Sequence, residues 1–132
     1  MEDDPVLFMQ GSKDGLVDPT CVSTWLTSNV FPALKLGAGT KIAGDTTFTR
    51  TRYANPAGVP FEYITHTYST TSSFLGFNLL GHCYPGSTDL TVTPPAQTVV
   101  PPDQLISFGC NDTCSFTWGE EVIRFFMAHP KP

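Results

Sequence analysis

The chain contains 132 residues, a length suited to a protein with one buried core, and we predict a single domain over residues 1–132. Only 14% of the residues are charged and the formal net charge is -5 at pH 7, which argues against nucleic acid or an anionic membrane as a partner. No apolar stretch approaches the length of a membrane span, and the acidic residues after Met1 are unlike the basic start of a signal peptide.

The first predicted element is a strand over residues 5–10, which are apolar up to Gln10. The run lacks the alternation of a half-exposed strand and is typical of a parallel strand covered on both faces. The loop that follows carries Asp14. A carboxylate there serves either as a turn former that bonds its own backbone or as an acid that orients a histidine. The loop by itself leaves both interpretations open.

A helix is predicted next, with Asp18 as its N-cap and Pro19 as its first residue, and Pro32 limits its extent. Its apolar residues follow helical spacing: Val22, Trp25, Leu26 and Val30.

Residues 47–69 contain two β-rich runs around the turn sequence Asn-Pro-Ala-Gly at 55–58, and they are predicted to form a hairpin. Arg50 and Arg52 share one face of the first run, where a solvated face is favoured over a carboxylate-binding pair. His66 lies in the second run, and we expect a half-buried structural histidine away from the Asp14 loop.

A third apolar run over residues 74–81 is predicted to be a strand that leads directly into His82. Residues 84–105 are rich in proline, threonine and glycine, and they are predicted to form a long surface excursion. The glycine before His82 and the Pro-Gly turn after it would fix the histidine loop and leave the imidazole exposed.

The last predicted element is an amphipathic helix that ends at His129-Pro130. Thr117 and Glu120 have the spacing of a capping box, and Glu121 is expected to have no role beyond the first turn. The apolar stripe of this helix consists of Trp118, Val122, Phe125 and Phe126.

The four cysteines are Cys21, Cys83, Cys110 and Cys114, and none belongs to a paired CxxC zinc motif. Disulfides are favoured over free thiols, and no metal site is predicted. Cys21 opens the helix after the Asp14 loop and Cys83 adjoins His82, so we expect Cys21–Cys83 and Cys110–Cys114 if both loops share one edge of the sheet. The low charge fraction favours a secreted or periplasmic protein, and this chain would begin after its signal peptide.

Buried strands that alternate with helices predict an open α/β sheet, whose sites lie outside the carboxyl ends of the strands. Asp14 and His82 each follow such an end. Neighbouring parallel strands lie about 4.8 Å apart, so we expect their loops to bring the Asp14 carboxylate to Nδ1 of His82. A carboxylate on that nitrogen makes a neutral imidazole a useful general base.

The segments PVLFMQGSKDGLV, LLGHCYPGSTD and FTWGEEVIRFFMAHP resemble the C-terminal part of the polyhydroxybutyrate depolymerase and feruloyl esterase group of α/β-hydrolases. That group has its triad acid in a Gly-x-x-Asp setting and its histidine in a Gly-His-x-x-Pro-Gly setting, which Asp14 and His82 match. The resemblance implies an α/β fold, the C-terminal portion of an α/β-hydrolase sheet with parallel strands, flanking helices and a β-hairpin. It also implies a carboxylic-ester hydrolase that acts on an ester or polyester without a cofactor. Tyr84 stands where the group often has tryptophan, and it is a candidate substrate contact.

The third member of a catalytic triad is missing, because no G-x-S-x-G pentapeptide occurs in the chain. The resemblance places the nucleophilic serine in an N-terminal half upstream of Met1, so the chain alone is expected to be inactive. The alternative is a catalytically inert fragment that self-associates as a binding or structural module, since open sheet edges and apolar faces favour association. The expected partner is thus the missing half or a second copy, with no nucleic acid and no membrane.

Overall fold

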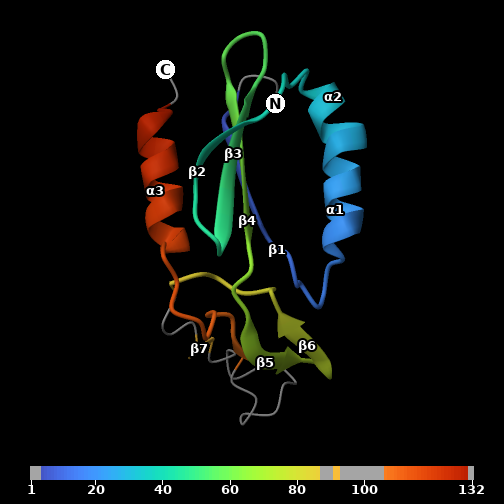
Figure 1. Ribbon diagram of the computed structural model, residues 1–132, viewed down its shortest axis with the longest axis vertical. Helices are drawn as coiled ribbons and strands as arrows, with labels where there is room; N and C mark the ends of the chain where they lie inside the picture. The colour runs from blue at the N-terminus through green and yellow to red at the C-terminus, as the bar shows by residue number, and fades with distance from the viewer. Residues whose placement is uncertain (1–3, 87–90, 93–105, 131–132) are drawn as a thin grey trace.

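The computed structural model describes residues 4–86, 91–92 and 106–130 (Figure 1). Its largest sheet has four strands in the order β1-β4-β3-β2. The bounds are Val6–Gly11 for β1, Thr40–Gly44 for β2, Phe48–Ala54 for β3 and Pro60–His66 for β4. β1 runs parallel to β4, whereas β4 is antiparallel to β3 and β3 is antiparallel to β2.

The prediction of an α/β-hydrolase sheet of parallel strands is therefore wrong. The predicted hairpin is present, with Gly58 N donating to Asn55 O over 2.9 Å, but a turn this short can join only antiparallel strands. The connection from β2 to β3 is shorter still, so antiparallel pairs dominate the sheet. β1 is parallel as predicted but mostly half-buried rather than covered on both faces, because it lies at the end of the strand order.

Helices lie on either side of this sheet in Figure 1. One helical segment comprises α1 (Pro19–Trp25), the π-helix η1 (Leu26–Val30) and α2 (Phe31–Ala33). The Asp18 side chain caps it as predicted by accepting from the amides of Thr20 and Cys21. Its far end is anchored by aromatic packing, since the Phe31 ring lies 5.3 Å from the Phe61 ring.

The apolar run at 74–81 is a hairpin and not a strand of the main sheet. β5 (Thr70–Phe74) pairs antiparallel with β6 (Phe77–Leu80) in a separate sheet. The turn between them places Gly76 at a φ of +84°, a conformation that glycine adopts without strain. β7 (Thr91–Val92) and β8 (Ile106–Ser107) form a further short pair. Most of the predicted surface excursion at 84–105 lies outside the described residues.

The last helix, α3 (Trp118–Ala128), begins after Thr117 and ends before His129 as predicted, but its cap and part of its buried face differ from the prediction. Thr117 makes no side-chain capping bond, so the predicted capping box is not formed. Phe125 is buried as expected, but Phe126 is exposed and Glu121 takes a buried position instead. Glu121 faces the sheet because it pairs with Arg50 of β3, a contact that the apolar stripe of the helix does not predict.

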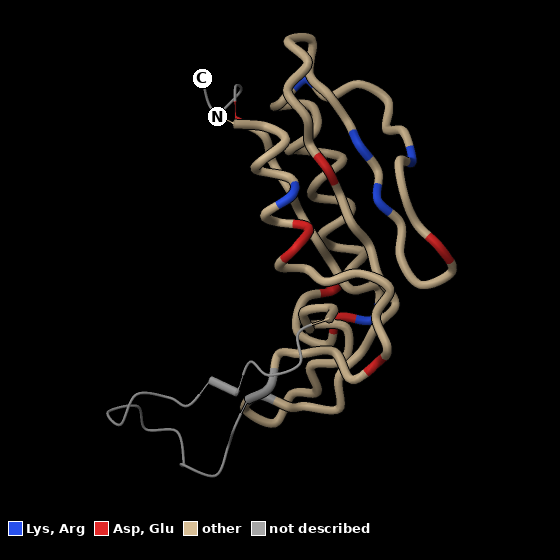
Figure 2. Tube along the Cα trace, turned by 90° about the vertical axis from the view of Figure 1, so that its left-hand side faces the viewer, with Lys and Arg blue, Asp and Glu red and all other residues tan. Residues whose placement is uncertain are grey.

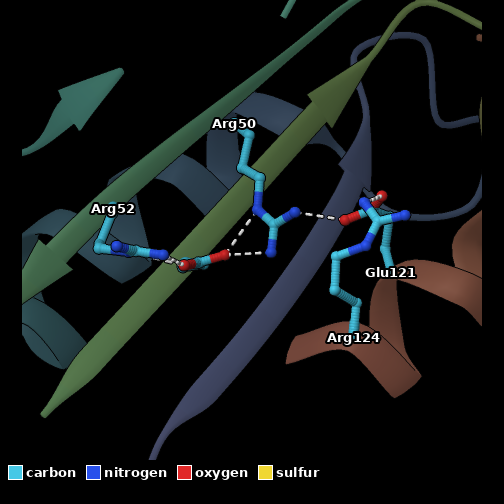
Figure 3. A network of polar contacts seen from close by, with 5 residues as sticks. Arg50, Arg52, Glu121 and Arg124 are labelled. Carbon is cyan, nitrogen blue, oxygen red and sulfur yellow. Dashed lines mark hydrogen bonds and ion pairs between the residues drawn. The ribbon is translucent and has the colours of Figure 1, made fainter. Parts of the chain in front are cut away.

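That contact belongs to a network of ion pairs between the sheet and α3 (Figure 3). Glu62 of β4 is 0% exposed and binds Arg50 and Arg52 of β3, with 2.7 Å between Arg52 Nε and Glu62 Oε1. Arg50 also reaches Glu121, which pairs with Arg124 on its own helix. The prediction of a solvated arginine face is wrong for Arg50, whose side chain is 12% exposed, whereas Arg52 is 47% exposed even though it binds Glu62. The prediction that Glu121 has no further role is wrong.

Charge is otherwise sparse. Figure 2 shows acidic and basic residues spread along a trace that is mostly uncharged. Within the described residues, no helix has the length and apolar character that crossing a membrane requires.

Candidate active site

Asp14 and His82 are in direct contact. Oδ2 of Asp14 lies 2.9 Å from Nδ1 of His82. The other carboxylate oxygen, Oδ1, accepts from the backbone amides of Leu16 and Val17 over 2.8 and 2.9 Å. Asp14 is thus both a turn former and a histidine partner. One carboxylate oxygen forms the turn and the other contacts the histidine, so both interpretations of the loop apply.

The two loops meet by a different route from the predicted one. Asp14 follows β1, but His82 follows β6, which is not a strand of the main sheet. The two segments are joined backbone to backbone: Gly15 N donates to Leu79 O over 3.0 Å, and Gly81 N donates to Lys13 O over 2.9 Å. The predicted contact between Asp14 and His82 is confirmed, while the expected origin in two neighbouring parallel strands is wrong.

Two glycines make this close approach possible. A Cβ atom on Gly11 would lie 2.1 Å from the carbonyl oxygen of Gly81, and one on Gly81 would lie 2.8 Å from the amide nitrogen of Asp14. Both distances are too short for a real side chain, and the obstructing atoms are backbone. The glycine that precedes His82 is therefore required by packing between the two loops.

The surroundings suit a histidine that acts as a base. The Asp14 side chain is 8% exposed, whereas the imidazole of His82 is 38% exposed. An ionised carboxylate only accepts hydrogen bonds, so a contact of this kind requires Nδ1 of His82 to donate, and in the neutral tautomer that donates from Nδ1 the other ring nitrogen, Nε2, is an acceptor. Among the described residues, no hydroxyl or thiol is hydrogen-bonded to His82, so the structure supplies no activated nucleophile there.

A cavity of about 150 Å³ adjoins the pair. The side chains that matter to its chemistry are those of Gln10, Asp14, His66, His82 and Tyr84. Tyr84, the candidate substrate contact predicted from the sequence, is exposed and lines this cavity. Its backbone amide donates to Phe108 O over 2.6 Å, which holds the segment after His82 against residues 108–110.

His66 also lines this cavity, a position that differs from the predicted one. It was expected along a strand away from Asp14 and His82, but it ends β4, opposite Gly11 of β1, and lines the same cavity. It is also fully buried rather than half-buried, at 1% exposure. Burial lowers the pKa of His66, while the Tyr68 backbone and the charge of Asp14 act in the opposite direction. Its location becomes predictable only once β4 is known to be the parallel neighbour of β1.

The cysteine pairing differs from the predicted one. The disulfide joins Cys83 to Cys110, and Cys21 and Cys114 are free thiols. Cys110 is brought to Cys83 by backbone pairing, since Cys110 N donates to Tyr84 O over 3.2 Å. Cys21 lies exposed on α1. The described residues contain no group of three histidine, cysteine or acidic side chains that could hold a metal ion.

Comparison with known proteins finds no match: no family model fits the chain, and no curated protein or solved structure is detectably similar to it.

Proposed function

We propose that Asp14 and His82 are the acid and the base of a serine carboxylic-ester hydrolase. The observation that carries the proposal is the contact of 2.9 Å between a largely buried carboxylate and Nδ1 of a partly exposed imidazole. This is the arrangement in which a carboxylate sets the histidine tautomer and stabilises the imidazolium that forms during proton transfer. The resemblance of the Gly-His-x-x-Pro-Gly segment to polyhydroxybutyrate depolymerases and feruloyl esterases gives it further support.

In this proposal the chemistry is acyl transfer to a serine that the 132 residues do not supply. Nε2 of His82 takes the proton of that serine as its oxygen attacks the ester carbonyl. His82 then returns the proton to the leaving alcohol, and Asp14 holds the ring throughout. Tyr84 is positioned to contact the ester or polyester substrate, and no cofactor takes part.

The partner that we propose is a polypeptide carrying the nucleophile and the oxyanion hole. Two features support association. Among the described residues, β1 is hydrogen-bonded to a strand on one side alone, so its other edge is open to pairing. Beside it, a cavity of about 480 Å³ separates β1 from the helical segment and is lined by apolar side chains that include Phe8, Trp25 and Phe61.

The same two features favour a second candidate function, a catalytically inert module that self-associates through β1. The candidates differ in what the Asp14–His82 pair is for. A binding module keeps its association when either residue is replaced. An esterase loses turnover but keeps its fold.

A disulfide between Cys83 and Cys110 supports an oxidising compartment, and we propose that the protein is secreted or periplasmic. Fractionation of cells that produce the protein would test this, because a reduced Cys83–Cys110 pair in a cytosolic pool would contradict it.

The esterase proposal is tested with p-nitrophenyl esters of short acids. The chain alone should hydrolyse them no faster than its His82→Ala variant. Addition of the polypeptide that carries the G-x-S-x-G serine should restore turnover, and Asp14→Asn should then lower kcat by about 10⁴-fold through the wrong imidazole tautomer. Replacement of the nearby Asp18 by Asn, which retains helix capping, is the matched control. Turnover unaffected by Asp14→Asn would contradict the proposal.

A further inference from the structure

Residues 111–113 have the sequence Asn-Asp-Thr, which fits the pattern Asn-x-Thr that accepts an N-linked oligosaccharide. The chain has three other asparagines, and none has a serine or threonine two residues later: Asn29, Asn55 and Asn78. Asn111 is therefore the one asparagine of the sequence with this motif. Three residues match by chance in many proteins, so the structural context decides what the match means.

The structure places the motif on the protein surface. Asn111, Asp112 and Thr113 are all exposed, and they lie in the loop between β8 and α3. A glycan is bulky and hydrated, so it requires a surface loop of this kind. Thr113 makes no hydrogen bond to any described residue, which leaves its hydroxyl available to the enzyme that recognises the motif.

The loop has a defined position because its neighbours anchor it. Cys110, the residue before the motif, is joined to Cys83 by the disulfide. The amide of Asn111 donates to Ser69 O over 2.8 Å, and the Asp112 carboxylate accepts from the amide of Ser69 over 2.6 Å. The motif is therefore held beside the start of β5.

The side-chain amide of Asn111 uses its oxygen in the fold but not its nitrogen. Oδ1 accepts from the backbone amide of Thr71 over 2.6 Å and from the Thr71 hydroxyl over 3.2 Å. Nδ2, the atom that a glycan modifies, donates to no described residue. Because a glycosylated amide keeps its carbonyl oxygen, the bonds to Thr71 are compatible with the modification.

We propose that Asn111 is a site of N-linked glycosylation, with a lipid-linked oligosaccharide as the sugar donor. A bond forms between Nδ2 of Asn111 and C1 of the first sugar, and the bond from that carbon to the lipid pyrophosphate breaks. Nδ2 loses one of its two protons, and the lipid pyrophosphate is the leaving group. The site rests on the proposed secretion of the protein, which the disulfide supports, and not on the esterase proposal.

The test is production of the chain behind a signal peptide in cultured mammalian cells, followed by treatment with peptide N-glycosidase F. The chain should migrate faster in a denaturing gel after treatment than before it. Peptide mass spectrometry should find that the enzyme has converted Asn111 to aspartate. Both the medium and the cell extract are analysed, so a chain retained inside the secretory pathway is also scored.

Two variants of Thr113 assign the glycan to the motif without altering Asn111. Thr113→Ala should abolish the change in migration because it removes the hydroxyl, whereas Thr113→Ser should retain it. Asn29→Gln changes an asparagine outside the motif and should also retain it. An Asn111 that stays unmodified in medium and extract would overturn the proposal, and so would a change in migration that persists in Thr113→Ala. Neither measurement involves ester hydrolysis, so failure of the esterase proposal would leave the result unaffected.

Discussion

At the scale of single residues, the candidate site depends on two glycines as much as on Asp14 and His82 themselves. Asp14 reaches His82 only because neither Gly11 nor Gly81 has a side chain to hold the loops apart. The imidazole orientation therefore rests on packing between two backbone segments.

We expect Gly81→Ala to separate the loops and break the bond between Asp14 and His82. The added methyl group would meet the Asp14 backbone, and overpacking of this kind costs about 1–3 kcal/mol of unfolding free energy. The Nδ1 proton of His82 should lose its downfield NMR resonance. Gly119→Ala is the control, because nothing lies within 4 Å of a Cβ there. An unchanged resonance in Gly81→Ala would refute the packing argument.

His66 should make the stability of the protein depend on pH. Its pKa is lowered by burial from the ordinary value of 6.5, so the unfolded chain binds a proton more readily than the folded one. The contribution of neutral His66 to the free energy of unfolding is fully present above pH 6.5. It is lost as the pH falls toward the lower pKa that His66 has in the folded protein. The slope is at most about 1.4 kcal/mol per pH unit for one proton.

Urea unfolding between pH 8 and pH 5 measures this effect. A His66→Phe variant should lose much of the decline in unfolding free energy below about pH 6.5, whereas His129→Gln should keep it. An identical pH profile for His66→Phe and the unaltered chain would show that other groups cause the decline.

At the scale of elements, α3 is positioned by charge as well as by apolar packing. Glu62 is fully buried between Arg50 and Arg52, and Arg50 extends the network to Glu121 on the helix (Figure 3). Phe125, four residues after Glu121 on the same face of α3, is also buried. A buried charge pair adds little net stability over an apolar pair, but it makes the loss of one partner costly.

Glu62→Gln should therefore destabilise the protein by about 3–5 kcal/mol, because Arg50 would keep a buried charge without its main partner. Glu120→Gln changes a neighbouring exposed carboxylate of α3 and should cost less than about 0.5 kcal/mol. Both values come from urea unfolding monitored by circular dichroism. A loss for Glu62→Gln no greater than that of Glu120→Gln would mean that the network contributes little to the position of the helix.

At the scale of the whole molecule, the proposed association surface consists of the outer edge of β1 and the apolar cavity beside it. The helical segment packs over the sheet at Phe31 but leaves about 480 Å³ beside Phe8 and Trp25. We expect the isolated chain to self-associate through this region when no other partner is present.

Phe8→Lys places a charge in the apolar cavity and should shift the chain toward a monomer in sedimentation equilibrium. Ile123→Lys, on the exposed face of α3, is the control and should leave the association unchanged. Circular dichroism checks that both variants remain folded. A purely monomeric unaltered chain, or a dimer insensitive to Phe8→Lys, would place the interface elsewhere or exclude it.

The sequence by itself determined the features that depend on near neighbours in the chain. The Asp18 cap, the hairpin turn at 55–58 and the glycine-flanked loops of Asp14 and His82 are all encoded within a few residues. The contact between the two loops was expected from their resemblance to a known pair of motifs, but the packing that produces it is long-range. Tertiary structure alone decided that β4 lies beside β1, that Cys83 pairs with Cys110, and that His66 and Glu62 are buried. The physical reason is that a short apolar run does not specify its partner strand. Long-range packing selects that partner, and it determines which polar side chains become buried.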